Sequence, residues 1–142
     1  MFLQQKLNDL KSPIKIAFIG CGKFISMFLS QYNQLQKIKI DSIIDLDIER
    51  AKKNCKKSGL SSLSINEINF SDSLDKVLDR EIDIFIEATG NPIVGTVHAK
   101  KIINKGRHVI LVRASTFQRL SHAQRALPTT TRTRDGQSRI AG

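Results

Sequence analysis

Apolar and polar residues alternate with two different periods along the first 112 residues of this chain. Compact apolar runs of strand length occur at 14–19, 38–45, 82–88 and 107–112. Apolar residues at helical spacing predict helices over 2–11, 23–35, 48–58 and 92–105. Strands that alternate with helices predict an α/β fold, with a doubly wound parallel sheet, right-handed crossovers and helices on both faces.

The helix predicted over 23–35 carries an apolar stripe that is expected to lie on the sheet: Phe24, Ile25, Phe28, Leu29, Tyr32 and Leu35. Asp47 is expected to cap the next helix, and Pro92 to begin the last one. The Ser- and Asn-rich segment 60–72 predicts one short strand around Leu63–Ile65. Asp72 is expected to cap a further helix through Leu74, Val77 and Leu78.

The composition changes sharply after Val112. Residues 113–142 contain six arginines and no lysine, with one acidic residue, and they include the polar run 128–134. Such a stretch buries too little apolar area to offset its ordering entropy, so it is predicted to be a disordered tail. The sequence therefore predicts one domain over 1–112 and an aberrant tail over 113–142, as a shifted reading frame or a fused foreign sequence would produce.

The net charge of +10 does not indicate a nucleic-acid-binding protein. Residues 1–112 hold 17 basic and 12 acidic residues, so half of the excess lies in the last 30 residues. The lysines of the first part are scattered or lie on helix faces, without interleaved aromatic residues. No apolar run approaches the length of a membrane span, and the first residues lack the pattern of a signal peptide. Two cysteines without metal-ligand spacing predict reduced thiols in the cytoplasm and no metal site.

The turn Gly20-Cys21-Gly22 separates the first predicted strand from the first long helix. Gly20 permits a tight turn, and Gly22 leaves room for a pyrophosphate at the helix N-terminus, where free N–H groups favour an anion. This arrangement is typical of a Rossmann-type dinucleotide-binding domain. Ile25 stands where a third glycine is expected. A low pKa of the Cys21 thiol at the helix start is one interpretation, and a small residue tolerated between two glycines is the simpler one.

Asp45 ends the second predicted strand, 23 positions after Gly22. A carboxylate at this distance is expected to accept hydrogen bonds from the adenosine ribose and to repel a 2′-phosphate. It therefore favours NAD over NADP, and the neighbouring Leu46 supplies no compensating cation. The alternative is a turn-forming or helix-capping aspartate, a role that Asp47 already fills.

The segment Ala88-Thr89-Gly90-Asn91 leaves the strand 82–88 at the edge of the sheet where ligands bind in doubly wound folds. It is expected to border the nicotinamide half of the cofactor, although a plain strand-to-helix turn uses the same residue types. His98 and His108 lack neighbours that suggest catalysis, so each is interpreted as a surface or packing residue. No catalytic residue is assigned.

Two segments carry a resemblance to a known family: Gly-Lys-Phe-Ile-Ser-Met-Phe-Leu-Ser-Gln at 22–31 and Glu-Ala-Thr-Gly-Asn-Pro at 87–92. With residues 44–51 and 106–112, they resemble the N-terminal half of homoserine-dehydrogenase-like NAD(P)-dependent oxidoreductases, whose members often carry a SAF domain. Aspartate dehydrogenase and the glucose–fructose oxidoreductase-like enzymes are more distant relatives by the same reasoning.

The resemblance implies a cofactor domain followed by a larger substrate domain. The expected cofactor-binding residues are those of the glycine turn, the ribose carboxylate and the strand end: Gly20, Cys21, Gly22, Lys23, Phe24, Asp45, Ala88, Thr89 and Gly90. After Val112 the family pattern is replaced by Arg113-Ala114-Ser115-Thr116, so the substrate domain, and with it a small-molecule substrate site, is expected to be missing. Such a truncated domain is also expected to self-associate, and Ile25 is expected to push its helix off the strand. The alternative function is a non-catalytic NAD-binding sensor or scaffold.

Overall fold

The computed structural model describes residues 5, 6 and 8–112. Five strands are present in this part: β1 (Ile14–Ile19), β2 (Ile38–Ile44), β3 (Asn69–Ser71), β4 (Ile84–Glu87) and β5 (His108–Leu111). The helices that connect them are α2 (Lys23–Gln31), α3 (Ile48–Lys57), α4 (Ser62–Glu67) and α5 (Pro92–Asn104), with one 3₁₀ turn at Tyr32–Gln34. Of the helix predicted over 2–11, residues 5, 6 and 8 are helical and the first four residues lie outside the described part. The predicted tail 113–142 also lies outside it.

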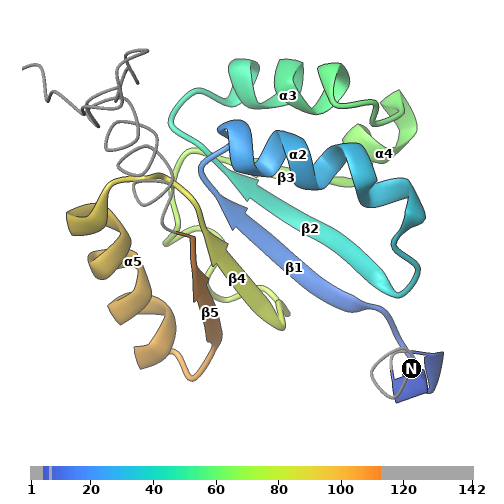
Figure 1. Ribbon diagram of the computed structural model, residues 1–142. Coiled ribbons are helices and arrows are strands. Elements are labelled where there is room, and N and C mark those ends of the chain that lie inside the picture. The colour runs from blue at the N-terminus through green and yellow to red at the C-terminus, as the bar shows by residue number, and fades with distance from the viewer. Residues whose placement is uncertain (1–4, 7, 113–142) are drawn as a thin grey trace, which may run out of the picture.

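All strand pairs are parallel, and the strand order is β3-β2-β1-β4-β5. From β1 the chain adds β2 and β3 on one side of the sheet, and it then returns to add β4 and β5 on the other side of β1 (Figure 1). This order is that of the Rossmann fold, and it confirms the predicted fold class. The connections that leave the carboxyl ends of β1 and β4 lead to helices on opposite faces of the sheet, so a topological switch point lies there. This is the place where open α/β sheets bind ligands.

Helices cover both faces of the sheet. On one face, Phe18 and Ile40 pack against Ile25 of α2 and Cys55 of α3. On the other face, Phe85 packs against Ile102 of α5 and against the turns after β3 (Figure 1). Ile19 before the glycine turn belongs to the second cluster, and Cys21 within the turn belongs to the first.

The predicted cap at Asp47 and the predicted helix start at Pro92 are both present. The Asp47 carboxylate accepts a hydrogen bond from the N–H of Arg50 at 2.9 Å, and α3 begins at the next residue. The Asn91 side chain accepts from the N–H groups of Ile93 and Val94, and Pro92 is the first residue of α5. Local sequence therefore determines where these two helices begin.

Two predictions for residues 60–79 are wrong. Leu63–Ile65 lie in helix α4 because the Ser61 hydroxyl caps it, and the short strand is Asn69–Ser71 instead. No helix begins at Asp72: residues 75–79 form turns in which the N–H groups of Val77 and Leu78 both bond to the Leu74 carbonyl. The Asp72 carboxylate pairs with Lys76 at 2.7 Å instead of capping. These turns insert Leu74, Val77 and Leu78 into the second core cluster.

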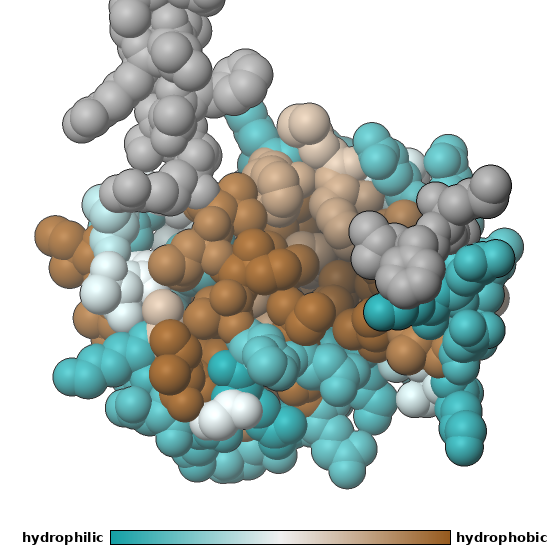
Figure 2. All heavy atoms as spheres, turned by 60° about the horizontal axis from the view of Figure 1, so that its bottom comes forward, coloured by the Kyte–Doolittle hydropathy of each residue, from teal (hydrophilic) through white to brown (hydrophobic). Residues whose placement is uncertain are grey.

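Two further expectations concern α2. Ile25 is completely buried in the first cluster, so its side chain fills the space between helix and sheet instead of separating them. Phe24, expected on the sheet-facing stripe, is 41% exposed. Strand β5 forms one edge of the sheet, and its residues Ile110 and Leu111 are about half exposed. Figure 2 shows a broad apolar area on the face of the molecule that it turns toward the viewer.

Candidate functional site

A cavity of about 1020 Å³ opens at the carboxyl ends of β1, β2 and β4, at the switch point of the sheet. Seven of the nine predicted cofactor-binding residues line it: Gly20, Cys21, Gly22, Lys23, Asp45, Ala88 and Thr89. Phe24 does not, and Gly90 lines a separate, smaller cavity beside Gly95 and Leu111. The fold thus brings together the glycine turn, the carboxylate after β2 and the residues after β4.

Gly20 lies in close contact with the backbone that follows β4. Its φ of +86° lies in the left-handed region, and a Cβ there would lie 3.0 Å from the backbone N and Cα of Thr89. Its N–H donates to the carbonyl of Ile44 at 2.7 Å. Only glycine allows both this backbone angle and the close contact with Thr89. Gly20 therefore holds the turn against the ends of β2 and β4.

Gly22 faces open space and begins α2 as its N-cap. Its φ of −89° suits any residue, and a Cβ built there would meet nothing within 4 Å. No side chain caps the helix, and the first turn contains no acidic residue. The free N–H groups and the positive end of the helix dipole therefore remain available to an anion in the cavity.

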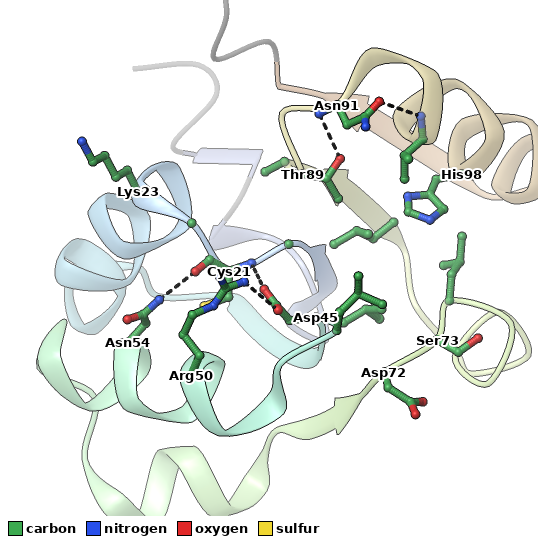
Figure 3. A pocket seen from close by; sticks show the side chains of 18 of the residues that line it. Cys21, Lys23, Asp45, Arg50, Asn54, Asp72, Ser73, Thr89, Asn91 and His98 are labelled. Carbon is green, nitrogen blue, oxygen red and sulfur yellow. Dashed lines mark hydrogen bonds and ion pairs between the residues drawn. The ribbon is translucent and has the colours of Figure 1, made fainter.

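Asp45 is held by three donors. Its Oδ2 accepts the N–H of Cys21 at 2.8 Å, and its Oδ1 accepts the N–H of Asp47 at 2.9 Å and Nη2 of Arg50 at 3.0 Å. Burial raises the pKa of the Asp45 carboxyl, but the N–H groups of Asp47 and Cys21 and the Arg50 guanidinium outweigh burial, so the pKa lies below its ordinary value. Asp45 is therefore a fixed carboxylate that ties the glycine turn to the start of α3 (Figure 3).

The side chain of Cys21 is buried in the first core cluster, and Asn54 of α3 donates to the Cys21 carbonyl at 2.9 Å. A hydrogen bond shared with Cys55 and burial both raise the pKa of the Cys21 thiol. The interpretation of a low pKa for the Cys21 thiol is therefore wrong, and the small buried side chain fits the simpler interpretation.

The segment after β4 carries a buried polar cluster. The Glu87 carboxylate is 5% exposed, and Oε1 accepts the N–H of Thr89 at 3.2 Å as well as its hydroxyl. Nδ1 of His98 lies 3.6 Å from the same oxygen and has no hydrogen-bond partner among the described residues. A Cβ at Gly95 would lie 2.7 Å from Glu87 Oε2, so this glycine leaves room for the carboxylate. His98, expected at the surface or in packing, lines the cavity.

Sequence reasoning missed Arg50 and Asn54, which both line the cavity. The available signal was spacing: the two residues lie four apart on α3, so they occupy one face of the helix above the end of β2. In Figure 3 Arg50 and Asn54 reach toward Cys21 and Asp45, whereas the Lys23 side chain extends away from them.

The described residues contain no group of three or more His, Cys, Asp or Glu side chains that could hold a metal ion. Within residues 5, 6 and 8–112, no helix combines the length and apolar character needed to cross a membrane.

Comparison with known proteins decides the class. Residues 14–127 match the sequence model of the GFO_IDH_MocA oxidoreductases, a family described by its NAD-binding Rossmann fold. The chain belongs to this family. It is thus an NAD-binding Rossmann domain of the oxidoreductase class, while the finer homoserine-dehydrogenase-like assignment is not what the match supports. No curated protein matches the chain.

Solved structures share the fold. A dehydrogenase from Chromobacterium violaceum is 25% identical to this chain with a TM-score of 0.58, and the match covers 72% of this chain and 28% of the dehydrogenase chain. GenD2 from gentamicin A biosynthesis, solved with NAD, is 17% identical with a TM-score of 0.57, covering 81% and 32%. The WlbA dehydrogenase from Bordetella pertussis, solved with NADH and UDP-GlcNAcA, is 21% identical with a TM-score of 0.52, covering 70% and 29%. This chain therefore spans about a third or less of the length of these proteins.

Proposed function

We propose that the cavity binds NAD in an extended conformation across the switch point. The pyrophosphate lies at the N-terminus of α2 beside Gly22, the adenosine ribose lies at Asp45, and the nicotinamide lies toward Ala88 and Thr89. The main support is that one cavity joins the ends of β1, β2 and β4 in a sheet of Rossmann strand order.

The geometry assigns a distinct contribution to each part of the site. N–H groups at the start of α2 bind the two negative charges of the pyrophosphate without a counterion from a side chain. The fixed Asp45 carboxylate offers an acceptor to a ribose hydroxyl, and the close contact of Gly20 with Thr89 sets the width of the crevice.

We further propose that the chain is the cofactor domain of an oxidoreductase that transfers a hydride between NAD and a small hydroxy- or aldehyde-bearing metabolite. The substrate site and the proton-transfer residues would come from the part of the similar proteins that the match to this chain does not cover. The segments at 22–31 and 87–92 support a homoserine-dehydrogenase-like subgroup. The two free, buried thiols support a reducing compartment such as the cytoplasm.

The test is a titration of the purified chain with NADH, followed by nicotinamide fluorescence, for three proteins: wild type, Gly22→Asp and Gly22→Asn. Both side chains fit the open space at the N-cap and both are good caps, so both variants are expected to fold at least as well as wild type. Only the aspartate places a negative charge where the pyrophosphate is proposed to lie.

Wild type is expected to bind NADH saturably, and Gly22→Asp to bind at least about tenfold more weakly than Gly22→Asn. The absence of saturable binding to wild type at millimolar NADH would refute the proposed function. Equal affinities of the two variants would refute the placement of the pyrophosphate.

A further inference from the structure

Glu87 and His98 form a buried pair at the end of β4 to which the proposed binding of NAD assigns no role. Nδ1 of His98 lies 3.6 Å from Glu87 Oε1, and the two side chains are 21% and 5% exposed. Within residues 5, 6 and 8–112, His98 is the only basic side chain at ion-pair distance from the Glu87 carboxylate. The imidazole is therefore the group that is placed to neutralise this carboxylate.

The fold makes room for the Glu87 carboxylate. A Cβ at Gly95 would lie 2.7 Å from its Oε2, although glycine is unfavourable in the interior of a helix such as α5. Oε1 accepts the N–H and the hydroxyl of Thr89, whose backbone touches Gly20. A buried carboxylate is costly unless donors or a cation accompany it. Thr89 supplies two donors, and a protonated His98 would supply the cation.

His98 connects this carboxylate to the cavity. The imidazole lines the cavity together with Ala88 and Thr89, whereas Glu87 does not line it. Figure 3 shows the His98 ring directed from α5 into the open space. An imidazole is the side chain that most readily gains or loses a proton near neutral pH. The charge at this end of the cavity can therefore change with pH through His98.

The other charged side chains that line the cavity, apart from Lys23, are already paired. They come from the turns after β3, from α5, from the end of β2 and from α3, and the pairs are Asp72 with Lys76, Asp75 with Lys101, and Asp45 with Arg50. Lys23 at the start of α2 extends away from the His98 side of the cavity (Figure 3). His98 is thus the group at this end whose change of charge no ion pair with another lining residue offsets.

The two redox forms of the cofactor differ in charge at the nicotinamide. The oxidised ring carries one positive charge, and the reduced ring carries none. A protonated imidazole beside the ring therefore weakens the binding of NAD and has little effect on NADH. With a neutral imidazole, the negative charge of Glu87 is not offset and favours the positive ring of NAD.

We propose that His98 determines, in response to pH, whether the site prefers NAD or NADH, with Glu87 as the residue that positions it and supplies the negative charge. The inference rests on the proposed function, because it takes the nicotinamide to lie toward Ala88 and Thr89. Falling pH shifts the preference toward NADH, and rising pH shifts it toward NAD. The proton comes from solvent, and no covalent bond of the cofactor changes.

The experiment is isothermal titration of the full chain with NAD, NADH and ADP-ribose between about pH 6 and about pH 8.5, for wild type, His98→Gln, Glu87→Gln and His108→Gln. ADP-ribose has the adenosine and pyrophosphate of NAD but no nicotinamide, so it reports pH effects that do not involve the ring. His108 is an exposed histidine of β5 that does not line the cavity, so its variant controls for the loss of an imidazole. Thermal unfolding shows whether each variant is folded.

The quantity to compare is the Kd of NAD divided by the Kd of NADH, because effects on the shared part of the two cofactors cancel in this ratio. In wild type the ratio is expected to rise at least about threefold from about pH 8.5 to about pH 6, while the affinity for ADP-ribose changes less than about twofold. His98→Gln should keep near pH 6 the ratio that wild type has near pH 8.5, and His108→Gln should match wild type throughout. Glu87→Gln removes the negative charge and should raise the ratio at least about threefold near pH 8.5.

A wild-type protein that binds both cofactors with a ratio independent of pH overturns this inference alone. So does a His98→Gln variant whose ratio changes with pH as in wild type, or an ADP-ribose affinity that varies with pH as much as that of NAD. Should His98→Gln fail to fold, Glu87→Gln decides, because a ratio equal to that of wild type near pH 8.5 excludes the carboxylate. Wild type that binds neither NAD nor NADH overturns the proposed function and the inference with it.

Discussion

At the scale of single residues, Asp45 connects the stability of the domain to its site. Its carboxylate joins the glycine turn to the start of α3 and is kept charged by three donors. A folded-state pKa below the unfolded value means that the contribution is present above the unfolded pKa, which is about 3.9 for aspartate. It is lost as the pH falls through the lower, folded pKa.

Asp45→Asn is therefore expected to be less stable than wild type at pH 7, and the difference in free energy of unfolding should shrink as the pH falls below about 4. Urea denaturation at a series of pH values, followed by circular dichroism, measures this. Two curves that stay parallel through the acid range would show that the Asp45 carboxylate is not held in its charged form.

Gly95 provides a second test at residue scale. A Cβ at this position would meet Glu87 Oε2 at 2.7 Å, so Gly95→Ala should displace a buried carboxylate and destabilise the domain. In a protein that already carries Glu87→Ala, the carboxylate that a Cβ at Gly95 would meet is absent. Gly95→Ala should then stabilise α5 by about 1 kcal/mol through helix propensity. The four unfolding free energies form a double-mutant cycle, and additive effects would exclude the contact.

At the scale of elements, caps and periodicity predicted most of the fold. Asp47 and Pro92 mark helix starts by local hydrogen bonding and backbone restriction, so they could be identified without tertiary structure. Residues 60–79 could not be predicted in this way. Whether Leu74 and Val77 lie in a helix or in turns depends on the core cluster that they enter, which is formed by distant strands.

The candidate site likewise contains some residues whose positions the sequence predicts and others whose positions it does not. Gly20, Gly22 and Asp45 have fixed positions relative to strand ends, and the sequence placed them in the cavity. Arg50, Asn54 and His98 come from helices whose rotation about their own axes is set by packing. The sequence shows that they exist but not that they face the same cavity.

Ile25 tests the packing of α2 on the sheet. From the sequence, Ile25 is expected to push its helix off the strand, whereas the structure buries Ile25 completely. Ile25→Gly should lose roughly 2–5 kcal/mol of stability for the buried side chain and about 1 more for glycine in a helix. Met27→Ala on the exposed face of α2 is the control and should change stability by less than about 1 kcal/mol. An Ile25→Gly protein as stable as wild type would show that the side chain does not support the helix.

At the scale of the whole molecule, the sheet has one poorly covered edge. Ile110 and Leu111 of β5 are 51% and 52% exposed, and Ile93 and Val97 of α5 are also exposed. Apolar surface of this kind promotes association of copies through the hydrophobic effect.

The purified chain is therefore expected to self-associate as its concentration rises, and Ile110→Lys to reduce this without a large loss of stability because the side chain is half exposed. Sedimentation velocity over a concentration series measures the association. A wild-type chain that remains monomeric at all concentrations would mean that this apolar edge does not attach to another copy.

The central claim is that the cavity at the switch point binds NAD. The most direct measurement is the change in ¹H–¹⁵N NMR signals of the labelled chain on titration with NAD. Saturable shifts are expected for the amides of Lys23 and Phe24 at the start of α2, for Asp45, and for Thr89, with little change in the exposed face of α3. Shifts that do not saturate, or that gather on β5 and spare the glycine turn, would contradict the account.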